Sequence, residues 1–253
     1  MKKNRSESIL EFVNQHHQVA VSELAAAFDV SLVTIRKDLT TLEEKGLLKR
    51  HHGMATVNDS DDLNYRLAQN YEVKQKIAIE AANLVESQDT IMIESGSTCA
   101  LLAQQLGKQK KQVTIITNSA FIANFVRNFA SLTIILLGGN YQPHSQVMVG
   151  PLTSQAIENF SVNYLFVGTD GFDAQKGFYC SDMMRAEVVK KMRASAQQLT
   201  ILTDSSKFEK SDLVHQFSLD EVDNVITDDR IEPRAKKAIH QAQVNIQTVA
   251  KEK

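Results

Sequence analysis

Seven short apolar runs rich in β-branched residues alternate with amphipathic helical stretches from residue 74 to the end of the chain. The runs occupy residues 90–93, 113–117, 132–137, 162–167, 199–203, 222–227 and 244–249. The helical stretches occupy residues 74–85, 100–106, 120–129, 152–159, 183–196 and 233–241. Continuous apolar strands are buried on both faces, and a parallel sheet needs a crossover between successive strands. The pattern therefore predicts an α/β fold with a mostly parallel sheet covered by helices.

The first 57 residues carry a different pattern, with three short helical segments followed by a pair of strands. Ser22 is predicted to cap the second helix and Ser31 the third, which we expect to end near Gly46. Residues 47–57 contain two short β-type runs around a glycine, which predicts a hairpin. Three helices followed by a hairpin predict a winged helix-turn-helix over residues 1–57.

An acidic segment separates the two patterns. Residues 58–62 are polar and show no periodicity, and residues 58–72 together carry a net charge of −3. We therefore assign residues 58–72 to a linker and residues 73–253 to a second, larger domain. The whole chain has a net charge of −2, which excludes a protein that coats nucleic acid without specificity. Basic groups that bind DNA must therefore gather on one surface.

The third helix of the N-terminal domain has one apolar and one polar stripe. Ile35, Leu39 and Leu42 fall within about 40° of one another around the helix axis, so they form its buried side. On the outward side, Arg and Lys can donate to guanine or phosphate, and methyl groups can contact thymine. The predicted DNA contacts, two of them in the hairpin, are Ser31, Val33, Thr34, Arg36, Lys37, Thr40, Arg50 and His51. The alternative interpretation is a small solvated helical hairpin with scattered charges.

The N-terminal segment also carries a dense set of motifs. They are Arg5, Ile9-Leu10, Ser22-Glu23-Leu24-Ala25, Val30-Ser31, Thr34-Ile35-Arg36-Lys37-Asp38-Leu39, Leu42-Glu43, Gly46 and Arg50-His51-His52-Gly53. In these residues the segment resembles the DeoR family of bacterial regulators, which implies sequence-specific binding to operator DNA. Two positions depart from the usual pattern of the family, with Lys37 in place of the common Arg and Met54 in place of a second Gly. A lysine lacks the planar fork with which arginine binds guanine.

Glycine- or hydroxyl-rich segments follow four of the predicted strands. They are Glu94-Ser95-Gly96-Ser97-Thr98, Gly138-Gly139-Asn140, Gly168-Thr169-Asp170-Gly171 and Asp204-Ser205-Ser206-Lys207. The carboxyl ends of parallel strands share one edge, where ligands bind, and a helix that begins there favours an anion. The predicted effector contacts are Glu94, Gly96, Ser97, Thr98, Asn118, Gly138, Gly139, Asp170, Gly171 and Lys207. Ordinary turn chemistry is the alternative explanation for each glycine taken alone.

The larger domain resembles the sensor half of the same family. The matching segments are Lys74-Gln75-Lys76-Ile77-Ala78, Thr117-Asn118-Ser119, Leu136-Leu137-Gly138-Gly139, Val149-Gly150, Gly168-Thr169-Asp170-Gly171 and Asp204-Ser205-Ser206-Lys207-Phe208. The resemblance implies a Rossmann-like fold similar to ribose-5-phosphate isomerase and a phosphorylated sugar as ligand. Glu94, Cys99 and residues 179–185 depart from the usual pattern of the family, so the identity of the ligand stays open.

Together these features predict a cytoplasmic repressor of a carbohydrate-related operon whose larger domain senses a phosphorylated sugar or similar anionic metabolite. Helix-turn-helix proteins usually bind paired half-sites, so we expect a homo-oligomer, with the larger domain responsible for association. One rival is a sugar-phosphate isomerase-like enzyme with an accessory DNA-binding domain, in which Glu94, Asp170 and Lys207 supply acid, base and electrophile. Another is an architectural DNA-binding protein whose larger domain only oligomerises. We favour the regulator and expect no enzymatic activity.

No cofactor, metal or membrane partner is predicted. The pairs His16-His17 and His51-His52 lack a third ligand for a metal. No apolar run approaches the ~20 residues that are needed to cross a membrane. Cys99 and Cys180 have no metal-type spacing, and free thiols suit a reducing cytoplasm. We interpret Cys180 as a buried thiol rather than a redox sensor.

Overall fold

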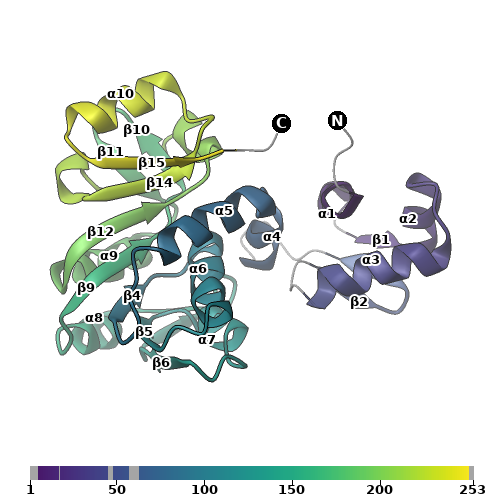
Figure 1. The fold of residues 1–253 in the computed structure, drawn as a ribbon, viewed down its shortest axis with the longest axis horizontal. Helices are drawn as coiled ribbons and strands as arrows, with labels where there is room; N and C mark the ends of the chain where they lie inside the picture. Colours follow the sequence, from purple (N-terminus) through teal and green to yellow (C-terminus); the bar gives the residue numbers. More distant parts are fainter. Residues whose placement is uncertain (1–4, 17, 45–47, 57–62, 251–253) are drawn as a thin grey trace. The chain divides into compact units, whose positions relative to one another are not determined.

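The computed structural model describes residues 5–16, 18–44, 48–56 and 63–250. The chain divides into two compact units, residues 1–71 and residues 72–252. Each unit packs around its own set of buried side chains. Figure 1 gives the positions of the helices and strands along the chain.

The smaller unit combines helices with a three-stranded antiparallel sheet. In its described residues, the helices are α1 (Arg5–His16), α2 (Val21–Ala27), α3 (Leu32–Glu44) and α4 (Leu63–Ala68). Strands β1 (Gln18–Ala20), β2 (Lys49–His51) and β3 (Met54–Thr56) lie in the order β1-β3-β2. Ile9, Leu24 and Ile35 are each 0% exposed, so the first three helices share one core. The predicted helix-turn-helix and its hairpin wing are confirmed, while Gly46 lies outside the described residues.

The two predicted helix caps have different outcomes. The Ser31 hydroxyl accepts a hydrogen bond from the Thr34 amide at 3.1 Å, so it caps α3 as predicted. The prediction for Ser22 is wrong, because α2 begins at Val21 and its N-cap residue makes no side-chain hydrogen bond. The Val21 amide instead donates to the Gly53 carbonyl in the wing at 2.9 Å. The wing thus takes the place of a capping side chain.

The larger unit is built on a seven-stranded parallel sheet. Its strands are β4 (Thr90–Ile93), β5 (Val113–Thr117), β6 (Leu132–Leu136), β9 (Val162–Val167), β12 (Ala196–Leu202), β14 (Asn224–Asp228) and β15 (Asn245–Val249). Each corresponds to one of the seven apolar runs, and every neighbouring pair is parallel. The helices are α5 (Tyr71–Ala82), α6 (Ser97–Lys108), α7 (Ala120–Phe125), α8 (Pro151–Ile157), α9 (Met183–Ala194) and α10 (Pro233–Gln241). The predicted α/β fold is confirmed.

The strand order β15-β14-β12-β9-β4-β5-β6 contains one reversal of direction. From β4 the chain adds β5 and β6 on one side, and it then adds β9, β12, β14 and β15 on the other. Because crossovers between parallel strands are right-handed, the connecting helices change face at the reversal. Figure 1 shows α6 and α7 on one face of the sheet and α8 and α9 on the other. The switch point therefore lies between β4 and β9, at the kind of position where open α/β sheets bind ligands.

Several short elements are not predicted by the sequence patterns. They are the hairpin of β7 (Asn140–Gln142) and β8 (Val147–Val149), the antiparallel sheet of β10 (Gly171–Asp173), β11 (Gly177–Cys180) and β13 (Val214–Phe217), and the 3-10 turns η1 (Ser205–Glu209) and η2 (Leu219–Glu221). Strands of three or four residues show too little periodicity to be recognised. Helix α4 also lies within residues 58–72, which the sequence assigns to a linker.

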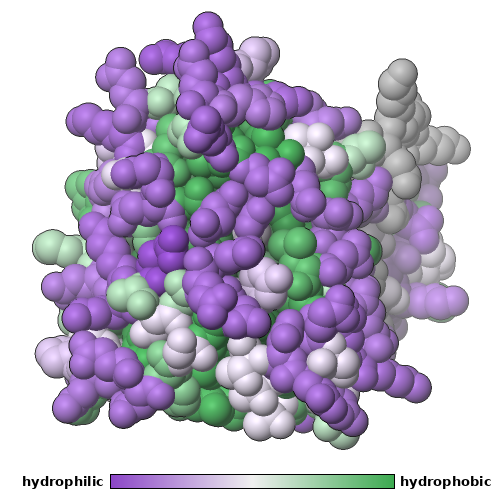
Figure 2. Space-filling view, turned by 60° about the vertical axis from the view of Figure 1, so that its left-hand side comes forward, coloured by the Kyte–Doolittle hydropathy of each residue, from purple (hydrophilic) through white to green (hydrophobic). Residues whose placement is uncertain are grey.

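The surface carries both hydrophilic and hydrophobic side chains (Figure 2). Figure 2 shows hydrophilic side chains over most of one face, with hydrophobic ones visible between them. Large exposed hydrophobic residues include Leu152, Met183 and Leu213. In the part of the chain that the structure describes, no helix is long and apolar enough to cross a membrane.

Candidate functional site

Helix α3 turns one face to the solvent. Val33 is 76% exposed in its first turn, and Arg36 and Lys37 are exposed one turn later. Ile35 and Leu39 are 0% exposed and fix the opposite side of the helix in the core. Apolar and cationic side chains that stand side by side match the major groove, where methyl groups contact thymine and cations donate to guanine.

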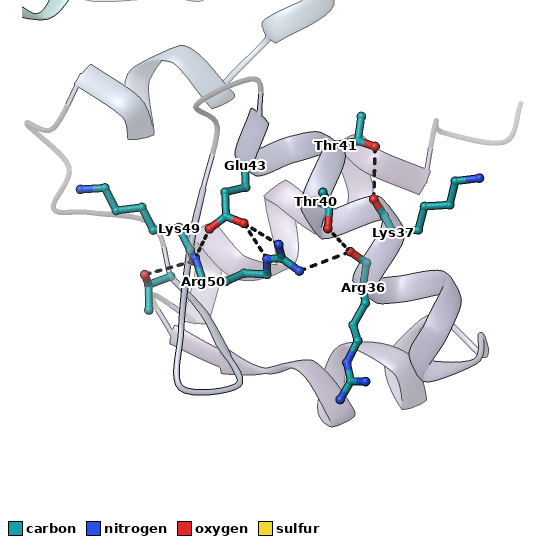
Figure 3. Close-up of polar contacts among 8 residues, drawn as sticks. Arg36, Lys37, Thr40, Thr41, Glu43, Lys49 and Arg50 are labelled. Atoms are coloured by element: carbon teal, nitrogen blue, oxygen red, sulfur yellow. Dashed lines mark hydrogen bonds and ion pairs between the residues drawn. The ribbon is translucent and has the colours of Figure 1, made fainter. Parts of the chain in front are cut away.

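Two acidic side chains of α3 are paired with arginines. Arg5 donates to Asp38 through two nitrogens, at 2.7 and 3.2 Å. Arg50 in the wing donates to the Glu43 carboxylate from Nε at 2.8 Å and from a terminal nitrogen at 2.6 Å (Figure 3). Burial raises the pKa of Glu43, but the hydrogen bonds from Arg50 outweigh it and hold this pKa below its ordinary value. These paired carboxylates therefore do not offset the cations on the exposed face of α3.

The side chains of Arg36 and Lys37 point away from the Glu43–Arg50 pair, as Figure 3 shows. Their side-chain nitrogens make no hydrogen bond or ion pair with any described residue. A long cationic side chain in this state keeps its donors available for a partner in the groove. These two residues are therefore the strongest DNA-contact candidates on α3.

Hydroxyl groups predicted to contact DNA are hydrogen-bonded within α3 itself. Thr40 donates to the Arg36 carbonyl at 2.9 Å. The hydroxyls of Ser31 and Thr34 are hydrogen-bonded to each other at 2.9 Å. Their contribution to DNA binding would come from methyl groups and helix geometry more than from these hydroxyls.

The wing contains one half-buried and one exposed candidate. Arg50 is half-buried, and its guanidinium holds the wing against α3 through Glu43. His51 is exposed and stacks on His52, with ring centroids 3.9 Å apart. Arg50 is therefore engaged within the protein, whereas the His51 side chain is exposed.

Four neighbouring strands of the larger unit, β5, β4, β9 and β12, end on the two sides of the switch point. The segments that follow them contain Asn118, residues 94–98, residues 168–171 and residues 204–207. We call these segments the switch-point edge. Neighbouring strands are about 4.8 Å apart, so the outer two end within about 15 Å of each other. A Cβ placed on Gly96 would lie 3.8 Å from the Cα of Gly168, so the loops after β4 and β9 approach closely.

The loop after β4 buries polar side chains. Ser97 and Thr98 are 6% and 5% exposed, and Glu94 is 5% exposed. The Ser95 hydroxyl donates to the Glu94 carboxylate. Ser97 and Thr98 begin α6, and the first N–H groups of a helix have no partner inside it. An anion at this position would meet two hydroxyls and the positive end of the helix dipole.

Asn118 adds a buried acceptor at the end of β5. Its side chain is 0% exposed, and its amide nitrogen donates to the Met148 carbonyl at 3.1 Å. Its Oδ1 atom is buried and has no hydrogen-bond partner among the described residues. Because a buried oxygen without a donor is costly, a donor such as a ligand hydroxyl fits this position.

Asp170 and Ser181 belong to a series of hydrogen bonds that ends at the buried Arg185. Arg185 is not among the predicted effector contacts. The Asp170 carboxylate accepts from the amide and the hydroxyl of Ser181, both at 3.2 Å. Arg185, in the first turn of α9, donates to the same hydroxyl at 2.6 Å and is 7% exposed. The departure of residues 179–185 from the family pattern is the one signal in the sequence that points to this region.

Cys180 lies in the same region. Burial raises the pKa of its thiol to about 11, and the negative charges of Glu94 and Asp170 act in the same direction. The thiol is therefore protonated at neutral pH, as expected for an unreactive cysteine. Among the described residues, no group of three or more His, Cys, Asp or Glu side chains could hold a metal ion.

Two of the glycines that are predicted to contact the effector lie where packing leaves no room for a side chain. A Cβ on Gly139 would lie 2.0 Å from the Thr153 hydroxyl, and one on Gly171 would lie 2.7 Å from the Lys210 carbonyl oxygen. Thr153 also donates to the Gly138 carbonyl at 2.8 Å. Gly138 and Gly139 follow β6, one strand beyond the switch-point edge. Packing accounts for Gly139 and Gly171 without a ligand, whereas a Cβ on Gly138 would meet no atom within 4 Å. The role of these glycines as effector contacts stays a prediction.

The segment after β12 carries a buried carboxylate. Asp204 is 2% exposed and accepts hydrogen bonds from the amide and hydroxyl of Ser206, at 3.2 and 2.5 Å. Lys207 is half-buried in the same turn. Burial raises the pKa of Asp204, but attraction to Lys74 and Lys207 and the hydrogen bonds from Ser206 hold it below its ordinary value. The segment therefore brings charges of both signs to the switch-point edge.

Two family models match the sequence. The DeoR-like helix-turn-helix domain matches residues 5–61, and the DeoR C terminal sensor domain matches residues 69–229. The chain belongs to the DeoR family. It is therefore a DNA-binding transcriptional regulator, and the family predicted from the sequence is confirmed.

Relatives of this DeoR-family chain match it over most of their length. The uncharacterized HTH-type transcriptional regulator YulB of Bacillus subtilis is 32% identical, over 97% of this chain and 96% of that protein. The L-fucose operon activator of Haemophilus influenzae is 32% identical, over 88% of this chain and 91% of that protein. The transcriptional repressor AccR of Agrobacterium fabrum is 29% identical, over 89% of each. All three are named for the control of transcription and not for an enzymatic reaction.

Solved structures share part of the fold. Ribose 5-phosphate isomerase A from Neisseria gonorrhoeae aligns over 55% of this chain and 54% of its own, with a TM-score of 0.42 and 17% identity. The translation initiation factor eIF-2B of Pyrococcus horikoshii OT3 aligns over 81% and 71%, with a TM-score of 0.43 and 14% identity. Likeness at this level carries no functional argument.

Proposed function

We propose that this regulator represses a carbohydrate-related operon and that a phosphorylated sugar, or a similar small anionic metabolite, controls its affinity for DNA. The observation that carries the proposal is the set of polar groups at the switch-point edge. Two buried hydroxyls begin α6, Asn118 offers an oxygen without a partner among the described residues, and Lys207 adds a cation. The name of the L-fucose operon activator supports the link to carbohydrate. The name of the transcriptional repressor AccR supports repression as the direction of control.

On the DNA side, the exposed face of α3 enters the major groove. Val33 contacts thymine methyl groups, and Arg36 and Lys37 donate to base edges or phosphates. His51 approaches the backbone from the wing. The exposure of these four side chains supports this arrangement.

Residues 73–253 sense the effector and hold the copies of a homo-oligomer together, with residues 58–72 as the connection to the winged helix-turn-helix of residues 1–57. Paired reading helices are needed because operators usually contain two half-sites. The protein acts in the cytoplasm, where its operator and a phosphorylated metabolite are both present.

The effector places its phosphate at the start of α6, beside Ser97 and Thr98, with Lys207 as an additional charge. Its hydroxyl groups donate to Asn118 and to Glu94 or Asp170. A phosphate gains both from helix N–H groups and from a nearby ammonium, whereas a neutral sugar gains from neither to the same extent.

The same carboxylates do not favour catalysis. A general acid or base must be within hydrogen-bond reach of the proton that it transfers. Glu94 accepts from the Ser95 hydroxyl, and Asp170 accepts from two groups of Ser181. These bonds leave acceptor sites for ligand hydroxyls, but they orient each carboxylate toward a neighbouring serine rather than toward a shared reacting atom. We therefore expect binding without turnover, and measurable isomerisation of ribose 5-phosphate by the purified chain would favour the enzyme instead.

Calorimetry on the full chain tests the effector site with a panel of pentose and hexose phosphates and their unphosphorylated sugars. The parent should bind a phosphorylated member and not its neutral sugar. Thr98→Ala combined with Lys207→Ala should weaken that binding at least about tenfold, because a charge-assisted hydrogen bond contributes about 1.5–3 kcal/mol. Lys210→Ala is the matched control, since Lys210 is exposed in the same segment but outside the switch-point edge.

Two results would count against the proposal. Equal binding by the parent and the double variant places the ligand elsewhere. Binding that leaves the affinity for a selected DNA duplex unchanged refutes the switch, because a ligand shifts an equilibrium only through its preference for one state.

A further inference from the structure

Arg185, in the first turn of α9, is a buried cation that hydrogen bonds attach to the switch-point edge. The residue is 7% exposed, and its Nη2 atom donates to the Ser181 hydroxyl at 2.6 Å. The same hydroxyl donates to the Asp170 carboxylate at 3.2 Å. One hydroxyl group therefore joins the guanidinium to the loop after β9, which is part of the switch-point edge.

The main chain at Arg185 is also held in place. Its amide donates to the Asp182 carboxylate at 2.8 Å, and this carboxylate caps α9. The second oxygen of Asp182 accepts from the Gln142 side chain of β7 at 3.1 Å. A side chain that is fixed at both its backbone and its head loses little conformational freedom when it binds a ligand.

The hairpin of β7 and β8 connects the start of α9 with the end of β5. On one side, the Asn118 side chain donates to the Met148 carbonyl at 3.1 Å, and the Met148 amide donates to the Asn118 carbonyl at 2.8 Å. On the other side, Gln142 holds the capping carboxylate of α9, and it pairs with Val147, the neighbour of Met148. Asn118 and Arg185 are therefore brought to the same part of the switch-point edge.

Two buried polar atoms in this part of the edge have complementary hydrogen-bonding roles. The Oδ1 acceptor of Asn118 and the Nε donor of Arg185 are both buried, and neither has a hydrogen-bond partner among the described residues. Arg185 bonds to Ser181 through another nitrogen of the same guanidinium. A buried donor or acceptor that stays unsatisfied is costly. Hydroxyl groups of a ligand suit both atoms, because a hydroxyl can donate as well as accept.

The carboxylates around Arg185 favour a neutral ligand group over a second anion. Asp170 shares the Ser181 hydroxyl with Arg185. Burial raises the pKa of the nearby Cys180 thiol, and the charges of Glu94 and Asp170 act in the same direction while that of Arg185 opposes them. A carboxylate or a second phosphate of a ligand would meet like charges here. A hydroxyl avoids this repulsion.

We propose that Arg185 is a specificity-determining residue of the effector site, whose Nε atom donates to one hydroxyl of the bound phosphorylated sugar. This proposal rests on the proposed function, because it requires such a ligand at the switch-point edge. The phosphate lies at the start of α6, and other hydroxyls of the sugar donate to Asn118. A sugar phosphate that lacks the hydroxyl leaves a buried donor unsatisfied and is bound more weakly.

Arg185→Met tests the contact, since it keeps the apolar stem and removes the donors. Arg193→Met is the matched control, because Arg193 lies on the same helix and its guanidinium donates to the main-chain carbonyls of Glu221 and Ala196. Calorimetry on the full-length variants uses the pentose and hexose phosphates of the panel. Arg185→Met should bind the tightest of them at least about tenfold more weakly than the parent, and Arg193→Met should bind it like the parent.

Analogues that lack one hydroxyl each, such as deoxyribose 5-phosphate beside ribose 5-phosphate, identify the group that Arg185 contacts. The parent should bind one analogue at least about tenfold more weakly than the complete phosphosugar. That analogue should lose nothing further in Arg185→Met, because both changes remove the same hydrogen bond. The other analogues should still lose about tenfold on the substitution.

Arg185→Lys separates the Nε donor from the charge. A lysine keeps the positive charge but places a methylene group where arginine has Nε. We expect Arg185→Lys to bind the complete phosphosugar about tenfold more weakly than the parent, with no further loss for the identified analogue. Parent-like binding by Arg185→Lys would show that the Nε atom makes no contact.

The outcomes separate this proposal from the function on which it rests. A parent that binds no phosphosugar of the panel overturns the effector site and the role of Arg185 with it. Parent-like binding by Arg185→Met, or an equal loss for every analogue, overturns the hydroxyl contact and leaves the effector site intact. If Arg185→Met fails to fold, Arg185→Lys with the same analogues decides.

Discussion

The Glu43–Arg50 pair allows a test of whether Arg50 positions the wing or contacts DNA. Glu43 accepts three hydrogen bonds from Arg50, from the main-chain amide at 3.0 Å and from the guanidinium at 2.8 and 2.6 Å. The Arg50 and Glu43 side chains are 29% and 36% exposed. Because solvent screens such a pair, we assign it about 1 kcal/mol rather than the upper end of the range for charge-assisted bonds.

Glu43→Gln and Arg50→Met, singly and together, measure this interaction. Each single substitution should destabilise the wing by about 1 kcal/mol, and the double variant should lose no more than either, because both remove one interaction. Thr56 pairs with Lys49 across the wing, in the register position next to Arg50, so its amide reports local opening. Hydrogen exchange on the full chain should be about fivefold faster there. Glu44→Gln, which changes the exposed neighbouring carboxylate, should exchange like the parent.

The same pair predicts a pH dependence. The folded-state pKa of Glu43 is lowered, so the stabilisation is present above the ordinary glutamate pKa of about 4.3 and is lost as the pH falls through the folded value. The protection factor of the Thr56 amide, which is the exchange rate corrected for the slower intrinsic exchange in acid, should therefore fall in acid for the parent more than for Glu43→Gln. An equal fall in both proteins would mean that Glu43 does not control the wing.

If the losses in stability were additive in the double variant, Glu43 and Arg50 would contribute independently, and the interaction between them would not hold the wing. DNA binding gives a second criterion. If Arg50 acts through the wing, Glu43→Gln and Arg50→Met should weaken binding to the selected duplex by the same factor. A greater loss for Arg50→Met, with a salt dependence reduced by about one unit, would instead show a direct phosphate contact.

Three further predictions concern other parts of the chain. Arg36→Ala and Lys37→Ala should each weaken binding to the selected duplex by about 1–3 kcal/mol without changing the circular dichroism spectrum; parent-like gel shifts would show that α3 is not the reading helix. Cys180, whose thiol pKa is raised to about 11, should react with iodoacetamide at neutral pH far more slowly in the folded chain than in urea, and similar rates would contradict its burial. A fragment of residues 72–253 should stay folded, associate and fail to bind the duplex, whereas a monomer at all concentrations in sedimentation velocity would place the oligomer contacts elsewhere.

The main sheet could be predicted because its strands are determined locally. Most of the seven strands centre on a short apolar run that ends near a turn residue or a polar segment, whereas three of the five residues of β15 are polar. The Ser31 cap was predictable for the same reason, since its partner is three residues away. The cap of α2 was not, because its acceptor is the carbonyl of Gly53 in the wing. A contact between distant segments leaves no trace in a local pattern.

The candidate site also has residues that the sequence predicted and residues that it did not, and the topology of the sheet explains the difference. Searching for polar segments after strands finds Thr98 and Lys207, but it passes over residues that precede a strand. Helices that connect parallel strands run antiparallel to them, so the first turn of each such helix lies at the carboxyl edge of the sheet. Thr98 in α6 and Arg185 in α9 both occupy first turns of such helices, and both are buried. Arg185 is therefore brought to the edge by the direction of its helix, a feature that follows from the fold class.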